Sequence, residues 1–477
     1  MKILLYLLLG LGVLITIVLV RTLLLKETPA KTAKVELDTS SRADEYAEIL
    51  ARMIRKETIS DRYNPDRKKF YEFHELLEEL FPHVHKTCEK HVFDGSLLFK
   101  WNGKGNHEPI LFMSHHDVVE ANGEWKHDPF SGDIDEEGNI WGRGTVDTKA
   151  SLFCELMAVE ELIKEGYVPE CDVYIASSCT EEISGKGAPM TVEYLKSQGV
   201  KLAYLMDEGG MILEEPVGGV KGIYGVVGVL EKGYGDVKFT AHGNGGHASA
   251  PGKNTPLVRL GKFMVDIENH NPFKKEFNAP AKEMFRRMAP NMVFYMKMIF
   301  ANMWLFEGLL SKILSSISAP GGAMIQTTLA FTKAKGSEGF NVLPQEAWVT
   351  GNMRFIPHQD SDESIALVSK IAKKYDIETE VIYKDSACPV VDYNGAPFKL
   401  VEEVAAEVYP GVGICPYVMT GGTDAKFYRD ISDHCLRFAP LYITDQQYKS
   451  IHALNENICK GTLPKGVEFY KIMIQRS

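Results

Sequence analysis

Residues 110–119, ILFMSHHDVV, join a short apolar run to three polar side chains at its end. The uninterrupted run Ile110–Met113 is typical of a strand buried on both faces of a parallel sheet. His115, His116 and Asp117 follow it directly, and α/β enzymes place their sites at the carboxyl ends of such strands. An H-x-D pair can bind a metal through His115 while Asp117 orients the imidazole. An ordinary loop pair is the competing interpretation of these residues.

Two more apolar runs along the chain lead into acidic side chains. Val173–Ser177 leads to Glu181 and Glu182, and residues 202–206 lead to Asp207. Between these runs, GRGTVDTKA (142–150) places Asp147 at a predicted strand-to-helix turn. The glycines of this stretch could suggest a nucleotide-binding loop, but Asp147 occupies the third glycine position of that motif. Carboxylates at the ends of buried strands are costly unless a cation compensates their charge, so this edge of the sheet is a candidate metal site.

Helical patterns at 46–56, 68–80 and 150–165 alternate with these strands and predict an α/β fold with a mostly parallel sheet. From residue 231 to 384 the pattern becomes strand, helix, strand, strand, helix, strand, the order of a ferredoxin-like α+β unit. We therefore expect an α/β domain in two parts, 42–230 and 385–477, with the α+β unit inserted at 231–384. The insert carries a further insertion at 272–320 that is rich in methionine and aromatic residues.

The amino terminus predicts a membrane helix. Residues 3–20 carry no charge and the apolar run resumes through Leu25, which is close to the length needed to cross a bilayer. We expect a transmembrane anchor at 1–25 and a polar linker at 26–41. A cleaved signal peptide is the alternative, but its apolar core usually spans only about 7 to 15 residues.

Charge and cysteine content exclude several classes of protein. The 477 residues carry a net charge of −11, which opposes binding to nucleic acid, so we expect no nucleic-acid partner. The eight cysteines show no paired spacing, so neither a zinc finger nor a dense disulfide framework is indicated. A small-molecule or peptide substrate fits this composition better.

Taken together, these segments resemble metallopeptidase family twenty over nearly the whole chain after residue 42. That family includes aminoacylase and glutamate carboxypeptidase, and the chain is most similar to its carboxypeptidase S and N-fatty-acyl-amino-acid hydrolase branch. The resemblance implies a zinc-exopeptidase-like catalytic domain with an inserted lid and dimerisation domain. It also implies two zinc ions, with cobalt or manganese as substitutes. One ion would be held by His115 and Asp207 and the other by Glu182 and His452, with Asp147 bridging them.

Four positions depart from the family pattern without removing a ligand, and they bear on local geometry and substrate choice. They are Ser114, Glu120, Thr148 and Ala150.

The resemblance further implies hydrolysis of an amide or peptide bond next to a free carboxylate. Water between two cations becomes acidic enough to supply hydroxide at neutral pH, with Glu181 as general base. His247, in GGHASAP (245–251), would reach across a homodimer and stabilise the oxyanion.

The resemblance also implies a pocket for the carboxylate of the substrate. Asn341 and Arg354 would bind that carboxylate, because arginine offers it a bidentate fork. Gly422 and Thr423, in GGTDA (421–425), would complete the pocket.

Several alternatives stay open from the sequence. The substrate is a small peptide or an N-acyl amino acid, so a dipeptidase or deacylase of the same family competes with a carboxypeptidase or aminoacylase. A membrane-tethered binding protein on an inactive scaffold is another class, although all five ligands and the base are present. The basic residues after the membrane helix place the body in the cytoplasm by the positive-inside rule, whereas the resemblance favours an extracytoplasmic body. The methionine-rich insertion is expected to be core or dimer contact, or to line a groove for an acyl chain.

Overall fold

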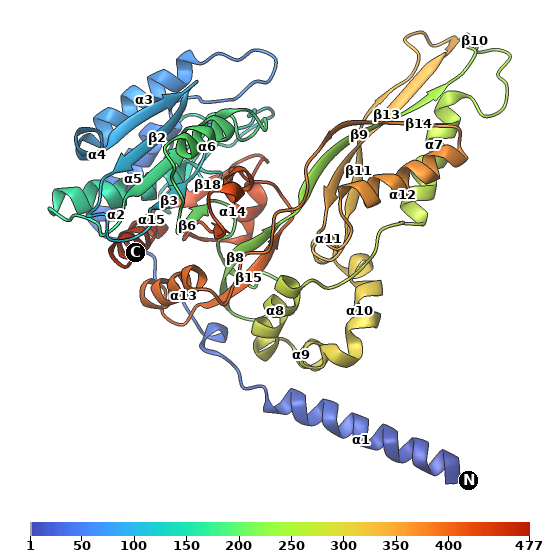
Figure 1. The fold of residues 1–477 in the computed structure, drawn as a ribbon, viewed down its shortest axis with the longest axis horizontal. Coiled ribbons are helices and arrows are strands. Elements are labelled where there is room, and N and C mark those ends of the chain that lie inside the picture. The colour runs from blue at the N-terminus through green and yellow to red at the C-terminus, as the bar shows by residue number, and fades with distance from the viewer. Residues whose placement is uncertain (1) are drawn as a thin grey trace.

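The computed structural model describes residues 2–477, which form a large α/β unit, a smaller four-stranded unit and a projecting amino-terminal helix (Figure 1). The large unit is built on a ten-stranded sheet. At its centre β3 (Ile110–Met113) lies between β5 (Val173–Ser177) and β6 (Tyr204–Asp207) and runs parallel to both. β16 (Cys435–Arg437) continues the parallel order beside β6.

The borders of this sheet are mixed, so the expectation of a mostly parallel sheet holds only for its centre. β2 (Ser96–Trp101) runs antiparallel to β5 and to β1 (Glu89–Phe93), and β8 (Ile223–Glu231) runs antiparallel to β7 (Ile212–Glu214). For β1 and β2 the physical reason is connection length, since a tight turn can join only antiparallel neighbours. Asp94 and Gly95, both at positive φ, form such a turn between β1 and β2.

Helices cover both faces of the large sheet. Side chains of β3 alternate between them, with Ile110 and Phe112 in one core cluster and Leu111 and Met113 in another. The first face is covered by α2 (Ser41–Ile54), α3 (Lys68–Leu80), α4 (Pro82–Thr87), α5 (Lys149–Lys164), α13 (Ala396–Val408) and α15 (Leu463–Gln475). The second face is covered by α6 (Gly187–Ser197) and the 3-10 segment η3 (Asp424–Asp430). β15 (Gly413–Met419) and β17 (Tyr442–Ile443) pair in parallel with β8 and β7.

The smaller unit has the predicted order of strands and helices. Its antiparallel sheet has the strand order β11, β13, β9, β14, and α7 and α12 pack with it in one core cluster. The elements are β9 (Gly233–His242), α7 (Pro256–Asn269), β11 (Thr328–Lys335), β13 (Glu346–Phe355), α12 (Ser361–Lys374) and β14 (Glu378–Lys384). β10 (Gly246–His247) and β12 (Val342–Leu343) pair at the tip of this unit (Figure 1).

The methionine-rich insertion folds into four helices against the large sheet. They are α8 (Ala279–Met288), α9 (Phe294–Ala301), α10 (Met303–Ile317) and α11 (Ala319–Ala323). Met284, Met288 and Met292 are buried in a core cluster with Tyr224 of β8 and Cys415 of β15. These three methionines therefore fill a core, as one of the two interpretations of the sequence expected.

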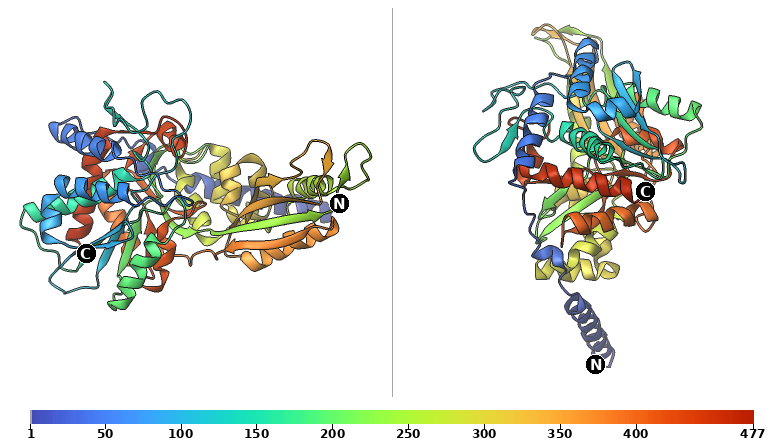
Figure 2. Two further views of the ribbon diagram at one scale, coloured as in Figure 1. Left: turned by 90° about the horizontal axis from the view of Figure 1, so that it is seen from above. Right: turned by 90° about the vertical axis from the view of Figure 1, so that its left-hand side faces the viewer.

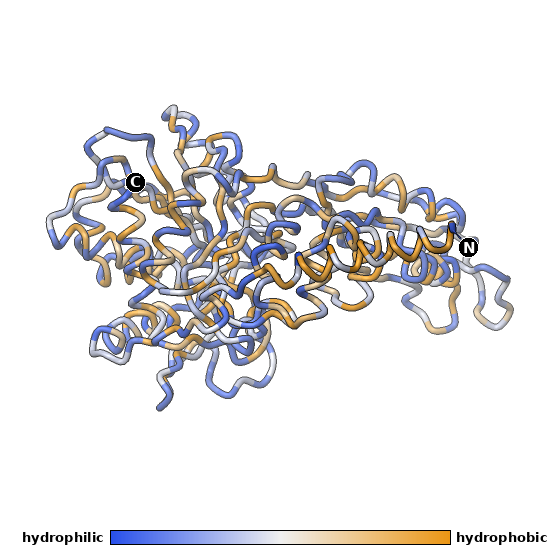
Figure 3. Tube along the Cα trace, turned by 90° about the horizontal axis from the view of Figure 1, so that it is seen from below, coloured by the Kyte–Doolittle hydropathy of each residue, from blue (hydrophilic) through white to orange (hydrophobic). Residues whose placement is uncertain are grey.

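The amino-terminal helix α1 (Lys2–Leu24) is long and apolar enough to span a membrane, and it leaves the body beside α9 (Figures 1 and 2). Figure 3 shows it as a nearly continuous hydrophobic run. The segment expected to be a linker packs on the body, because Ala30 is buried and the Thr28 N–H donates to Asn291 Oδ1 over 2.9 Å. These contacts fix where α1 begins relative to the body.

Candidate metal centre

Four of the expected ligands meet at the carboxyl edge of the parallel strands. His115 follows β3, Glu182 follows β5, Asp147 precedes α5, and His452 follows α14 (Asp445–Ser450). Asp147 lies between the two imidazoles, with Oδ1 2.9 Å from His115 Nε2 and Oδ2 3.0 Å from His452 Nε2. His452 Nε2 is also 3.1 Å from Glu182 Oε2. Ligand atoms of His115, Asp147 and Glu182 all lie within 4.8 Å of one another, so these residues form a candidate metal site.

The charges of this cluster are strongly coupled. Burial alone would lower the pKa of His115, but the hydrogen bond and charge of Asp147 raise it well above its usual range. Contacts with Asp147 and Glu182 raise the pKa of His452 to about 10. Burial opposes ionisation of Asp147, yet hydrogen bonds with the two histidines hold its pKa below its usual range. The carboxylates therefore favour positive charge at the position where a cation would bind.

Asp117 positions its neighbours in two ways. The His115 Nδ1–H donates to the backbone oxygen of Asp117 over 2.8 Å, which leaves Nε2 free to act as a ligand. The Asp117 carboxylate accepts the backbone N–H groups of Glu181 and Glu182, each over 3.1 Å. The sequence suggested that this carboxylate orients His115, but its Oδ1 is 3.6 Å from Nδ1. Its shorter contacts hold the turn that carries Glu181 and Glu182.

Asp207 ends β6 at the same edge of the sheet. Its two carboxylate oxygens accept the backbone N–H groups of Glu208 over 2.8 Å and of Ala425 over 2.7 Å. Burial raises the pKa of Asp207 to about 6, while those N–H groups and the charge of His115 act in the opposite direction. The structure thus brings Asp207 within electrostatic range of His115, on the side of the loop 421–425.

The donor set fits divalent cations. Imidazole nitrogens and carboxylate oxygens are the ligands of catalytic zinc sites, and His452, with half of its side chain exposed, leaves the centre open to solvent. Two buried carboxylate oxygens, Glu182 Oε1 and Asp424 Oδ2, have no hydrogen-bond partner within residues 2–477. Such oxygens are costly to bury without a cation.

Two further acids lie in this centre that the sequence analysis did not identify as site residues. Burial raises the pKa of Asp424 to about 7 and raises that of Glu208 well above its usual range. Glu208 follows Asp207 directly, and Asp424 belongs to GGTDA. These motifs were visible in the sequence, but only the fold shows that both side chains are buried near the same histidine.

A third acid, Glu456, holds the loop that carries Asp147. Its Oε1 accepts the backbone N–H groups of Gly144, Val146 and Asp147 over 3.1, 2.8 and 3.1 Å. Its Oε2 accepts Arg143 Nη1 over 2.8 Å. The antiparallel pair of β4 (Asn139–Trp141) and β18 (Asn457–Cys459) places this loop beside His452. The sequence signal for Glu456 was its place in the same HALNE stretch as His452.

Arg354, Gly422 and Thr423 converge at the junction of the two units. Thr423 donates through both N–H and Oγ1 to the carboxylate of buried Glu231, each over 3.1 Å. A methyl group on Gly422 would lie 3.4 Å from Glu231 Oε1 and 3.8 Å from Arg354 Nη1. Glu231 therefore occupies both donors of Thr423, and Gly422 lies beside the Arg354 guanidinium.

His247 and Asn341 lie at the other end of the inserted unit. His247 is exposed on β10, and the Ala248 N–H donates to the Asn341 backbone oxygen over 2.9 Å. β10 is at the far tip in Figure 1, away from β3, β6 and β18. Arg354 lies near the opposite end of β13. Within a single chain, Asn341 and Arg354 therefore lie at opposite ends of this strand, although the sequence analysis expected both to bind the same substrate carboxylate.

Comparison with known proteins identifies the family of this chain. The profile of Peptidase family M20/M25/M40 matches residues 111–476. The chain is 33% identical to the N-fatty-acyl-amino acid synthase/hydrolase of Xenopus tropicalis, covering 98% of this chain and 94% of that protein. It is 29% identical to a probable carboxypeptidase S-like protein of Dictyostelium discoideum, covering 94% and 89% of the two chains. The solved M20 family metallo-carboxypeptidase of Sulfolobus solfataricus shares the fold with a TM-score of 0.65 at 19% identity, covering 91% of this chain and 99% of that one.

Proposed function

Because the chain belongs to peptidase family M20/M25/M40, and is therefore a metallopeptidase or amidohydrolase, we propose that it is a di-zinc enzyme that cleaves an amide bond beside a free carboxylate. The observation that carries this proposal is the position of Asp147. One of its carboxylate oxygens contacts His115 and the other contacts His452, which is the arrangement required of a residue that bridges two cations.

The other four proposed ligands form two pairs, and Asp147 is common to both. His115 and Asp207 would hold one zinc, and Glu182 and His452 would hold the other, which with Asp147 would give each ion three protein ligands. Two bound cations would supply Lewis acidity, which makes water acidic near neutral pH and polarises the amide carbonyl.

Proton transfer in this reaction is assigned to Glu181. It shares its turn with Glu182, and the Asp117 carboxylate fixes both backbone N–H groups. Glu181 takes a proton from the attacking water as the water oxygen bonds to the amide carbon. It returns that proton to the departing nitrogen as the carbon–nitrogen bond breaks.

Substrate recognition is assigned to the junction between the units. The Arg354 guanidinium beside Gly422 pairs with the substrate carboxylate, and the two similar proteins named above suggest an N-acyl amino acid or the carboxyl end of a peptide. His247 belongs to β10, which lies at the tip of the inserted unit away from β3 and β6 in Figure 1, and Asn341 contacts Ala248 beside it, so a second copy supplies both residues across a homodimer. α1 anchors the enzyme as a single membrane span, with the catalytic body on the extracytoplasmic side.

Hydrolysis assays on the full chain, purified in detergent, test this function. We expect chelator-treated protein to be inactive and zinc to restore cleavage of long-chain N-acyl amino acids. The matched control substrate is the same compound with its carboxylate amidated, which should be a poor substrate because Arg354 loses its partner. Equal cleavage of both forms would contradict recognition of a carboxylate. Faster cleavage of free dipeptides than of any N-acyl amino acid would favour the dipeptidase alternative.

A further inference from the structure

Two helices of the methionine-rich insertion form an apolar elbow on the surface. α9 and α10 meet at a bend of 111°. Large apolar side chains on both helices are exposed, including Phe294 and Trp304, each at 56%, and Leu309 at 60%. Tyr295, Leu305, Ile313 and Ile317 add to this surface. Leu305, Leu309, Ile313 and Ile317 recur every four residues and so lie along one face of α10, and an exposed apolar face of this kind marks a contact with another apolar body.

The corner of the elbow packs against α1. Asn302, which joins the two helices and is fully buried, donates through Nδ2 to the Val18 backbone oxygen over 3.2 Å and to Thr22 Oγ1 over 3.3 Å. Arg21 Nη2 donates to the Ala301 backbone oxygen over 3.3 Å, and Lys297 Nζ donates to the backbone oxygen of Leu25. The last two turns of α1 are therefore fixed to the elbow.

These contacts set the height of the elbow relative to a bilayer. Val18 lies within the uncharged run 3–20 of α1, three residues before Arg21, the first charged side chain after that run. At a rise of about 1.5 Å per residue, the corner lies roughly 4 to 5 Å along the helix from Arg21, on the membrane side of it. If α1 spans the membrane, as proposed above, the elbow corner reaches below the boundary of the hydrocarbon layer. The exposed side chains beside it then face lipid.

We propose that the α9–α10 elbow is a second membrane contact, whose apolar side chains enter the leaflet from which α1 emerges. This inference rests on the proposed membrane anchor. Trp304 and Tyr295 suit the interface, where their polar edges meet the headgroups and their rings meet the acyl chains. The partner is the bilayer that contains α1.

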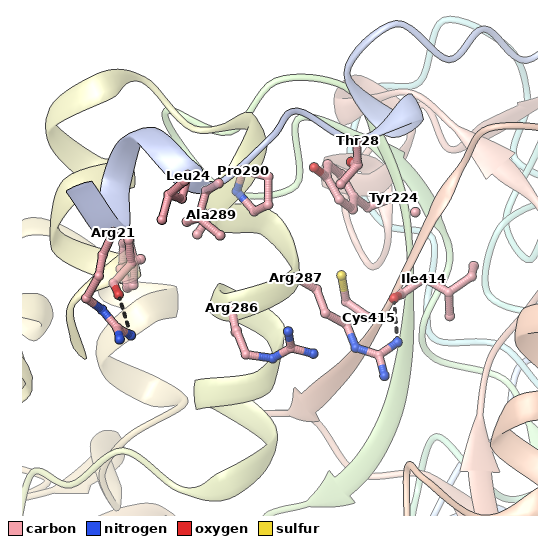
Figure 4. A pocket seen from close by; sticks show the side chains of 14 residues that line it. Arg21, Leu24, Thr28, Tyr224, Arg286, Arg287, Ala289, Pro290, Ile414 and Cys415 are labelled. Atoms are coloured by element: carbon pink, nitrogen blue, oxygen red, sulfur yellow. Dashed lines mark hydrogen bonds between the residues drawn. The ribbon is translucent and has the colours of Figure 1, made fainter. Parts of the chain in front are cut away.

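A pocket next to the elbow supports this placement (Figure 4). It has a volume of about 710 Å³ and lies between the end of α1, α8 and β15. Arg21, Arg286 and Arg287 line it together with apolar Leu24 and Phe300. Guanidinium groups beside apolar walls suit a phospholipid headgroup and the start of its chains. Glu283 and Glu402 pair with Arg286 and Arg287, and the chain carries a net charge of −11, so docking depends on apolar burial rather than on anionic lipid.

Fluorescence quenching in vesicles tests the proposal on the full chain. The protein is reconstituted into phosphatidylcholine vesicles, half of which carry bromine on their acyl chains, and tryptophan emission is compared between the two sets. We expect bromolipid to quench part of the wild-type emission and Trp304→Phe to lose that quenched part. Trp348→Phe, on the inserted sheet, should keep it, and adding phosphatidylserine should leave it unchanged.

The outcomes separate this proposal from the others. Vesicle flotation comes first, and a chain that does not float contradicts both the anchor and the elbow contact. A chain that floats but shows equal quenching with and without Trp304 contradicts the elbow contact alone. If bromolipid does not quench the wild-type emission and the protein forms dimers that Leu309→Glu dissociates, a second copy covers the elbow. That result also contradicts the membrane contact. Hydrolysis of N-acyl amino acids is scored separately and does not depend on any of these results.

Discussion

The carboxylate of Asp147 contacts both imidazoles of the candidate metal centre, and this residue could be identified from the sequence. The turn GRGTVDTKA placed an acid between a predicted strand and a predicted helix. Three neighbouring strands also led to acids. The motif and the strand order pointed to His115 and Glu182, which meet Asp147 in the structure, whereas His452 was expected only from the family resemblance. The structural roles of Glu231 and Glu456 could not be predicted, because the residues that they contact lie about 190 and 310 residues away in the sequence.

Substitution of Glu181 should separate proton transfer from metal binding. We predict that Glu181→Gln retains zinc and lowers kcat by about 10²- to 10⁴-fold, because the amide cannot take a proton from water. Zinc content and turnover, measured on one preparation, check this. The matched variant Glu182→Gln removes a proposed ligand instead and should lose zinc. Wild-type turnover in Glu181→Gln would exclude Glu181 as the base.

Buried Lys232, at the junction of β8 and β9, should give the protein a pH-dependent stability. Burial lowers its pKa to about 7, well below the usual value of about 10.5 for a lysine. Below pH 7 the lysine is charged in both the folded and the unfolded protein, so the full free-energy cost of burying the charge destabilises the folded state. Between about 7 and 10.5 the unfolded state binds more protons, so the free energy of unfolding rises with pH, by on the order of 1 kcal/mol per unit.

Urea unfolding at several pH values measures this effect. Lys232→Met should remove the rise that wild type shows over this range, although it also leaves the backbone oxygens of Ala323 and Gln326 without their donor. Lys282→Met, at an exposed position, is the control and should keep the rise. Parallel pH profiles for wild type and Lys232→Met would show that Lys232 is charged in the folded protein.

At the scale of the elements, the predictions from sequence succeeded where a strand was short, apolar and uninterrupted. Ile110–Met113 and Val173–Ser177 were located to the residue, because both lie fully buried in the parallel centre. β8 was not identified, although all of its residues are buried, since two glycines interrupt its β-branched run. β15 contains Pro416 and was missed for a similar reason. The elbow could not be distinguished from a core segment, because apolar content does not tell whether protein or lipid covers it.

The loop 142–147 depends on a single acid from another element. Glu456→Gln keeps an oxygen for the three backbone N–H groups but turns an NH₂ group toward the Arg143 guanidinium. We predict a fall in zinc affinity of about 10- to 100-fold, because Asp147 loses its fixed position. Competition with a chelator measures the affinity. Glu160→Gln, at a buried acid that caps α4 through His83 and Val84, is the control and should bind zinc as wild type does.

At the scale of the whole molecule, the tip of the inserted unit lies far from the metal centre of its own chain. The proposed function therefore requires His247 to come from a second copy. We predict that His247→Ala and Glu181→Gln are each nearly inactive alone. Isolated mixed dimers should recover roughly half of wild-type activity, because one of the two sites in each mixed dimer is complete. Co-expression with two affinity tags isolates those dimers, and inactive mixed dimers would show that His247 acts within one chain or not at all.

Anomalous diffraction at the zinc edge, from crystals of the zinc-loaded full chain, tests the central claim most directly. We predict two peaks about 3.5 to 4 Å apart with Asp147 between them. One should lie about 2.0 to 2.2 Å from His115 and Asp207, and the other at that distance from Glu182 and His452. A single peak, or two peaks that Asp147 does not bridge, would contradict the proposed di-zinc centre.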